Sequence, residues 1–358
     1  MAVITRYVDV DAAAGGDGTT NALTGANCAY KSLNIWEAAQ QQNLDTGNNI
    51  AECICESNHA NHTADTTVVT IDGWTTSATD YISIKTSAAG RHDGKWNTGK
   101  YRLEIPELWG GGALTIYENF VRVEGLQFTL IDGSYVFYTA IDYLTNGADV
   151  RISNSIYKGL LTANCTGITL ATDNSSGTVS VKAWNNIMYN FSGSSAVGIY
   201  ANAWLSTATL YAYNNTIYNS YSGCEIYGSS VLVAKNNISY NNTTDFSGTF
   251  DASSNYNFSK DATAPGAQSI HGTADGKTPD FVNTGAGTED FHLQSTSDAI
   301  GVGTDNPGSG LYSTDIDGQT RTSTWDIGAD EYVAVETGKY VIILKPITIS
   351  TPLWAMEV

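Results

Sequence analysis

Cysteine and histidine are the residues of this 358-residue chain that could hold a transition metal, and there are five of each. Cys53 and Cys55 are followed by His59 and His62, and thiolate and imidazole are the ligands that zinc prefers. The spacing is short and irregular, however, and residues 50–55 alternate like a strand, in which the two cysteines share one face. Small thiols are also common in protein cores. The pattern therefore favours a core strand over a zinc site, and we expect no bound metal.

Three aspartates near the N-terminus could bind calcium, because this ion takes oxygen ligands. They are Asp9, Asp11 and Asp17. Their spacing does not match an EF-hand loop, and aspartate is also common in turns, where its side chain bonds the backbone. We therefore expect no cofactor, with calcium at these aspartates as the alternative.

Catalytic patterns are missing from the sequence. It contains no nucleophile elbow and no phosphate-binding loop. Cleavage of a glycosidic bond needs two carboxylates about 5–9.5 Å apart, or acids that hold calcium beside a base. The outward acids Asp142 and Glu225 would lie three coils apart in the repeat described below, about 14 Å at the spacing of stacked strands. We therefore predict no catalytic residue.

Cations and aromatic rings offer binding chemistry instead. Arg122, Arg151 and Lys182 recur at one outward repeat position. Stacked about 4.8 Å apart, they would repel each other and need anionic neighbours, such as Glu124 and Asp149, or an anionic ligand. Outward rings stack on sugars or anchor protein partners, unless loops cover them. The candidate rings are Trp184, Tyr200, Trp204, Tyr211, Tyr213 and Tyr227.

A repeating strand must position these side chains. Two sets of segments keep step along the chain at intervals of 22–31 residues, which is a solenoid spacing. Alternate positions are aliphatic, as in strands with one buried face. The first set begins at Val121, Val150, Val181, Leu210 and Leu232, and the second at Ala140, Gly167, Gly198 and Glu225. The two sets predict an all-β parallel β-helix with core columns Val123, Ile152, Ala183, Ala212, Ala234 and Ile141, Ile168, Ile199, Ile226.

Asparagines recur in step with the first set of strands. Asn154, Asn185, Asn214 and Asn236 stand at one repeat position, where stacked side-chain amides can bond to one another at a tight turn. We predict a structural ladder there.

The two ends of the chain differ from the repeats. Residues 1–48 predict an N-terminal cap with a strand, a loop and an amphipathic helix, and residues 49–332 predict the β-helix. The cap helix would place Leu33, Trp36, Ala39 and Leu44 on one face. Residues 333–358 form a β-prone tail that would cap the last coil or mediate assembly. The tail residues expected at an assembly contact are Tyr340, Ile342, Leu344, Ile347 and Trp354.

Both ends of the solenoid also resemble a known group. Residues 7–39 look like the opening segment of right-handed parallel β-helix proteins of the pectate-lyase-like superfamily. Several motifs resemble the closing segment of that group: Pro279-Asp-Phe-Val, Asp290-Phe-His-Leu, Ser297-Asp-Ala-Ile-Gly, Asp315-Ile-Asp-Gly-Gln-Thr-Arg and Asp326-Ile-Gly-Ala-Asp-Glu-Tyr. The resemblance implies a right-handed β-helix over residues 7–332. It implies no single function, because the superfamily contains polysaccharide lyases, glycoside hydrolases, phage tailspikes, adhesins and non-catalytic virion proteins.

Charge and composition narrow the classes of function. The chain has 17 basic and 36 acidic residues, a net charge of −19, which argues against binding nucleic acid or anionic lipid. No apolar run is long enough to insert into a membrane, and the first residues lack a secretory signal. We expect a non-enzymatic structural or decoration protein of a virion or extracellular fibre, a homo-oligomer that contacts other subunits. The alternative is a tailspike-like or secreted protein that binds or degrades polysaccharide, such as a cell-surface glycan.

Overall fold

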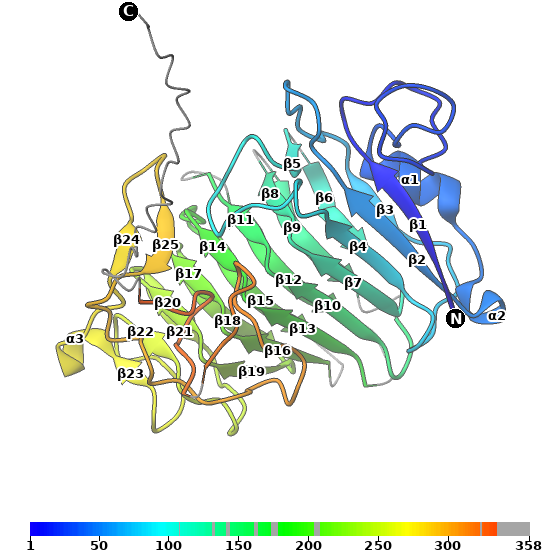
Figure 1. The fold of residues 1–358 in the computed structure, drawn as a ribbon. Coiled ribbons are helices and arrows are strands. Elements are labelled where there is room, and N and C mark those ends of the chain that lie inside the picture. Colours follow the sequence, from blue (N-terminus) through cyan, green and yellow to red (C-terminus); the bar gives the residue numbers. More distant parts are fainter. Residues whose placement is uncertain are drawn as a thin grey trace, which may run out of the picture.

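The computed structural model describes residues 1–106, 108–130, 133–140, 144–160, 164–172, 178–203, 208–322 and 324–334. Within them the chain winds as a right-handed parallel β-helix, as predicted (Figure 1). This is also the hand that parallel β connections adopt. Each central coil contributes one strand to each of three parallel sheets, and the coils stack from the N-terminus towards the C-terminus.

The first sheet contains eight strands and carries most of the candidate residues. Its strands, in spatial order, are β1 (Ala2–Val8), β2 (Asn49–Cys55), β4 (Ile82–Thr86), β7 (Phe120–Glu124), β10 (Asp149–Ser153), β13 (Ser180–Trp184), β16 (Thr209–Tyr213) and β19 (Val231–Lys235).

The other two sheets complete each coil. The second sheet contains β5 (Arg102–Ile105), β8 (Gln127–Leu130), β11 (Ile156–Lys158), β14 (Ile187–Tyr189), β17 (Thr216–Tyr218), β20 (Ile238–Tyr240), β22 (Phe258–Ser259) and β23 (Ile270–His271). The third contains β3 (Val69–Ile71), β6 (Leu108–Ile116), β9 (Gly133–Ala140), β12 (Thr166–Thr172), β15 (Val197–Ala203), β18 (Ser222–Gly228) and β21 (Thr244–Ser247).

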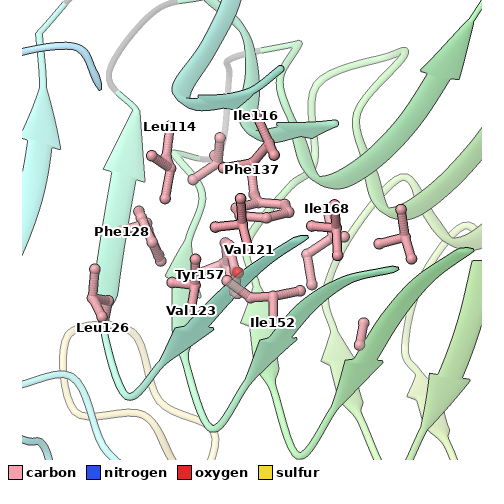
Figure 2. Packing of buried hydrophobic residues seen from close by; sticks show 14 of the residues in the cluster. Leu114, Ile116, Val121, Val123, Leu126, Phe128, Phe137, Ile152, Tyr157 and Ile168 are labelled. Carbon is pink, nitrogen blue, oxygen red and sulfur yellow. The ribbon is translucent and has the colours of Figure 1, made fainter. Parts of the chain in front are cut away.

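The register of the first sheet is the one that the repeat predicts. Val150 pairs with Val121 on one side and with Val181 on the other, and the series continues through Leu210 to Leu232. All five side chains are fully buried. Figure 2 shows how side chains of the three sheets meet in the core: Val121, Val123 and Ile152 from the first sheet, Phe128 and Tyr157 from the second, and Ile116, Phe137 and Ile168 from the third.

The predicted register of the third sheet is correct in the middle and wrong at one end. Ile168 pairs with Ile199 as expected, but Ile199 pairs with Cys224 and not with Ile226. On the other side Ile168 pairs with Phe137, and the predicted partner, Ile141, lies outside the described residues.

A column of glycines explains this register. Alternating patterns look the same when they slip by two residues, so the sequence pattern alone does not distinguish Cys224 from Ile226. A Cβ atom added to Gly198 would lie 2.9 Å from the carbonyl oxygen of Gly223, and one added to Gly167 would lie 2.6 Å from that of Gly198. The close approach of these backbones requires glycine opposite glycine, which aligns Gly198 with Gly223 and therefore Ile199 with Cys224.

The asparagine ladder exists, but the predicted column is only part of it. Asn154, Asn185, Asn214 and Asn236 all have left-handed backbone angles, with φ of 49–58°, and side-chain bonds join Asn185 to Asn154 (3.1 Å) and Asn236 to Asn214 (3.2 Å). The next position along the chain forms an unbroken buried ladder with amide-to-amide bonds of 3.0 Å. Its members are Asn186, Asn215, Asn237 and Asn257.

The N-terminal end is covered by two short helices. Helix α1 (Leu33–Gln40) begins at Ser32, whose hydroxyl accepts the Ile35 N–H, and α1 packs against β1, β2 and β3 (Figure 1). Helix α2 (Leu44–Gly47) follows. The predicted apolar face is partly wrong, because Leu44 belongs to the second helix and Ala39 is exposed.

Glu37 takes the buried position on α1 that the apolar pattern assigned to Ala39. Its carboxylate accepts the Trp74 indole N–H at 3.2 Å, which satisfies both buried polar groups.

The closing segment, residues 299–332, runs back along the turns between the first and second sheets. It follows α3 (Gly272–Asp275) and the antiparallel pair β24 (Phe281–Asn283) and β25 (Asp290–Leu293). Thr304 bonds Asn236, Tyr312 bonds Asn214 and Thr314 bonds Asn185. The segment then returns, and the carbonyls of Asp326 and Gly328 accept the side-chain amide of Asn214. The predicted tail residues Tyr340, Ile342, Leu344, Ile347 and Trp354 lie outside the described residues. Within the described part of the chain, no helix has the length and apolar character to cross a membrane.

Candidate functional site

The three predicted cations form a column on the outer face of the first sheet. Arg122 on β7 pairs in register with Arg151 on β10, and Arg151 pairs with Lys182 on β13. The neighbouring residues on each strand point into the core, so the alternation of the strand directs the three cations outward. The next two strands add Tyr211 and Val233 to the same column.

Asp149 is bonded to two of these cations. Its carboxylate accepts hydrogen bonds from Arg151 at 2.5 and 2.8 Å and from Lys182 at 2.7 Å. Burial would raise the pKa of Asp149, but the bonds from Arg151 and Lys182 hold it below its usual value. Glu124, the other acid expected here, binds Arg91 at 3.1 Å instead. One carboxylate therefore balances two cations.

Arg122 is held differently from its neighbours. Its guanidinium carbon lies 3.3 Å from the centroid of the Tyr81 ring, a cation–π contact. Within the described residues Arg122 forms no ion pair. The Arg122 side chain is partly buried, and this loss of contact with solvent lowers its pKa. The column thus contains a partly desolvated cation without a carboxylate partner.

The column forms the floor of a groove beneath the closing segment. One hollow of about 220 Å³ is lined by Tyr81, Ser83, Lys85, Arg122, Val123, Glu124, Arg151, Ser153, Trp184 and Leu311. A second of about 320 Å³ is lined by Arg151, Lys182, Tyr211, Tyr213 and residues 308–311. Arg151 and Leu311 line both hollows, so we treat them as one feature, the cationic groove. Glu124 carries the only carboxylate among the described residues that line it.

The candidate aromatic side chains do not form one exposed surface. Trp184 and Tyr213 are not exposed, because the closing segment covers them: the Tyr312 ring stacks on Trp184 with centroids 5.7 Å apart. Tyr211 remains half-buried in the groove, with its ring 6.0 Å from that of Tyr213. Of the two arrangements considered from the sequence, covering by a loop therefore holds for Trp184 and Tyr213.

The remaining aromatic candidates lie elsewhere. Tyr200 belongs to the third sheet, where it pairs with Glu225, and burial together with that carboxylate raises its pKa to about 12. Tyr227 is exposed near the end of β18. The structure does not bring either ring to the cationic groove, and Trp204 and Asp142 lie outside the described residues.

The residues considered as candidate zinc ligands are divided between a buried strand and the loop that follows it. Cys53 and Cys55 are completely buried in β2, and burial raises the pKa of the Cys53 thiol well above its usual value, which disfavours the thiolate that zinc needs. Residues His59 and His62 lie beyond the strand, where the His62 ring bonds the Ser57 hydroxyl at 2.9 Å. The two cysteines therefore belong to the core.

The candidate calcium ligands each bond nearby backbone groups. Asp9 accepts the N–H of Asn58, Asp11 that of Thr63, and Asp17 that of Thr19. The Asp17 bond, and a further bond from the Asp11 N–H to Asp9, are the local turn chemistry that the sequence also allowed. Asn58 and Thr63 follow β2 in the chain, so the other two bonds join the N-terminal segment to the loop after that strand.

Sequence reasoning missed two parts of the groove, the Tyr81 ring and the loop at residues 308–312. Tyr312 donates to Asn214 at 2.8 Å, although the two residues are far apart in the chain. No family model matches this chain, and no curated protein matches it. The site's geometry is therefore the basis for a functional proposal.

Proposed function

We propose that this protein is a non-enzymatic, pectate-lyase-like β-helix that binds an anionic glycan in the cationic groove. The observation that carries this proposal is the charge of the groove. Lys85 and the three cations of the column line it; Lys85 is paired with Glu52 at 2.9 Å, and Asp149 is the carboxylate that Arg151 and Lys182 share. Of the two expectations from the sequence, this geometry favours the glycan-binding one.

The spacing of the cations suits a chain of acidic sugars. Neighbouring strands lie about 4.8 Å apart, which is similar to the length of one sugar residue. Successive uronate groups can then meet Arg122, Arg151 and Lys182 in turn. Arginine binds carboxylates through two parallel hydrogen bonds, and the half-buried Tyr211 ring offers an apolar face for a sugar.

The groove also supports a non-catalytic role. A hydrolytic pair needs a second carboxylate about 5–9.5 Å from the first, and Glu124 is the acid that lines the groove in the described part of the chain. The Glu124 carboxylate is itself engaged in an ion pair with Arg91.

Binding can be measured by titrating the protein with polygalacturonate, alginate and neutral dextran at low and high salt. We expect binding of at least one anionic chain, weakening with salt, and no binding of dextran. Arg122→Gln should lower the affinity about tenfold, whereas Lys260→Gln, at an exposed lysine outside the groove, should not. Failure of all the anionic chains to bind, or rapid release of reducing or unsaturated ends, would refute the proposal.

A second candidate function is the structural role in a virion or fibre, and it is favoured by the edge strand β1. Beyond β1 the first sheet has no further strand in the described residues. Residues 7–9 bond the loop at 18–30, but Met1 and Val3 remain 68% and 55% exposed. An uncovered edge can accept a strand from another chain.

The mass in solution tests this second function. Val3→Lys should reduce any oligomer to a monomer if β1 forms the contact, whereas Val282→Lys, at another exposed valine, should not. A protein that is monomeric at all concentrations would contradict assembly through β1.

A further inference from the structure

A second cluster of functional groups lies where β25 meets the closing segment. The His292 ring, the Asp317 carboxylate and the Asp330 carboxylate each offer a ligand atom, and these three atoms lie within 4.8 Å of one another. The residues come from three separate places in the chain: β25, the turn at 314–320 and the last motif of the closing segment. The fold therefore assembles a mixed nitrogen and oxygen site.

The His292 ring is oriented by a fourth residue. Its Nδ1 atom lies 2.5 Å from Oδ1 of Asp290, and its Nε2 atom lies 2.7 Å from Oδ2 of Asp317. Histidines that bind metals almost always have the second ring nitrogen held by a carboxylate or carbonyl, which fixes the ring orientation. Asp290 holds Nδ1 in this way, so Nε2 is directed towards Asp317.

Asp330 is a buried carboxylate. Asp330 is only 4% exposed. Its Oδ2 atom accepts the Leu293 N–H at 2.8 Å. In the part of the chain that the structure describes, Asp330 forms no direct ion pair of its own. A buried carboxylate is costly unless a cation or proton compensates it.

Gly94 packs closely against the ligand atoms. A Cβ atom at this position would collide with the His292 ring and would lie 2.7 Å from Oδ1 of Asp317. The cluster is accessible from solvent on another side, because Asp317 lines a cleft of about 570 Å³ together with Ala88, Arg91, His92, Asp93, Asn97 and Lys100. A small cation could therefore reach the cluster.

We propose that His292, Asp317 and Asp330 bind one divalent transition-metal ion of the zinc type, with Asp290 as a positioning residue. Imidazole nitrogen together with carboxylate oxygen suits Zn²⁺ better than Ca²⁺, which takes oxygen ligands. On binding, the metal replaces the proton between Nε2 and Asp317, and that proton leaves to solvent. The ion then joins β25 to the closing segment in place of the histidine–aspartate hydrogen bond.

Metal titration of the chelator-treated full chain tests this site. Zn²⁺ in calorimetry should bind with one high-affinity site per chain and raise the melting temperature. Co²⁺, used as a spectroscopic probe, should show visible absorption bands of a site with mixed nitrogen and oxygen ligands. An equal concentration of Ca²⁺ should not displace either ion.

Variants distinguish this site from adventitious metal binding. Asp317→Asn and His292→Ala should abolish the site. His271→Ala is the matched control, because His271 also lies beside an aspartate, Asp275, but outside the cluster, and it should bind Zn²⁺ as the wild type does.

Asp290→Asn tests the positioning role and covers the case in which the ligand variants do not fold. This variant keeps all three ligands, so it should still bind Zn²⁺ but about 10- to 100-fold more weakly. The proposal is overturned if the folded wild type takes up no Zn²⁺ or Co²⁺, or if Asp290→Asn and His271→Ala change the affinity equally.

Discussion

The guanidinium of Arg122 rests on the Tyr81 ring, with its central carbon 3.3 Å from the ring centroid. Its two neighbours in the same column are bonded to Asp149 instead. An aromatic face orients a cation without neutralising it. Arg122 therefore keeps its full charge for a ligand, while the ring limits the rotamers that the long side chain can adopt.

Removing the ring should weaken both stability and binding. For Tyr81→Leu we expect the free energy of unfolding to fall by about 1 kcal/mol, which is the scale of a cation–π contact. Affinity for an anionic glycan should also fall, because Arg122 would have to be ordered on binding. Urea unfolding and calorimetric titration measure the two effects. Tyr221→Leu, at an exposed tyrosine outside the groove, should change neither; an unaltered affinity in Tyr81→Leu would contradict the role given to the ring.

Replacing Asp149 should move stability and affinity in opposite directions. Asp149→Asn weakens the charge-assisted bonds to Arg151 and Lys182, so we expect a loss of about 2 kcal/mol in the free energy of unfolding. The groove also gains one unit of positive charge, so polygalacturonate should bind more tightly at low salt.

Glu104→Gln is the matched control for Asp149→Asn. Glu104 also pairs with an arginine, Arg102, at 2.8 Å, but outside the groove. This variant should leave glycan affinity unchanged. If Asp149→Asn binds the glycan more weakly than the wild type, the groove does not bind its ligand through these cations.

The stability of the N-terminal coils should depend on pH through Glu118. Its carboxylate accepts the Trp74 N–H at 2.7 Å and is almost fully buried, and burial, followed by the nearby Asp72 and Glu37, raises its pKa from 4.5 to about 7. The folded state therefore holds this proton more tightly than the unfolded state. The stability that the proton provides is complete below pH 4.5 and is lost as the pH rises towards 7.

Glu118→Gln mimics the protonated side chain and keeps an oxygen to accept the backbone N–H of Trp74. At pH 8 it should be more stable than the wild type by about 2 kcal/mol, since partial screening by solvent reduces the full effect. Near pH 4 the two proteins should be equally stable. Melting temperatures across this range measure the difference, and an advantage of the same size at both pH values would contradict the assignment.

The sequence predicts the repeating part of this fold well, because each coil repeats the same local pattern. One residue in two faces the core along β7, β10, β13, β16 and β19, so aligning the valines and leucines also aligns Arg122, Arg151 and Lys182. The register of the third sheet is harder to predict from the sequence, because the alternating pattern around Ile226 resembles that around Cys224. Backbone contact between glycines decides the register there.

The parts that the sequence does not predict depend on contacts between distant segments. Trp184 and Tyr213 occupy outward strand positions, and nothing local to them indicates that Tyr312 will cover them. The same is true of His292 in β25 and Asp317 in the turn at 314–320, which have no repeat to align them. The closing segment therefore decides both the shape of the cationic groove and the assembly of the histidine–aspartate cluster.

We expect the position of the closing segment to depend most on Arg321. Its side chain is completely buried and pairs with Glu331 at 3.2 Å, and it donates to Asn185 at 2.9 Å and to the carbonyls of Gly328 and Ala329 at 3.0 Å. The planar guanidinium can serve these acceptors together, whereas the single ammonium of lysine cannot reproduce their geometry.

Arg321→Lys should therefore lower the free energy of unfolding by about 3 kcal/mol, since it leaves buried acceptors and part of a buried ion pair unsatisfied. Because the closing segment forms one wall of the cationic groove, the variant should also lose glycan affinity and become sensitive to proteolysis within residues 299–332 while the coils stay folded. Arg6→Lys, in the edge strand β1, should do neither, since the Arg6 side chain donates to the carbonyl of the neighbouring Thr5 and not to the closing segment. Cleavage spread evenly over the solenoid in Arg321→Lys would show that the closing segment and the coils unfold together, and that this arginine does not fasten the segment separately.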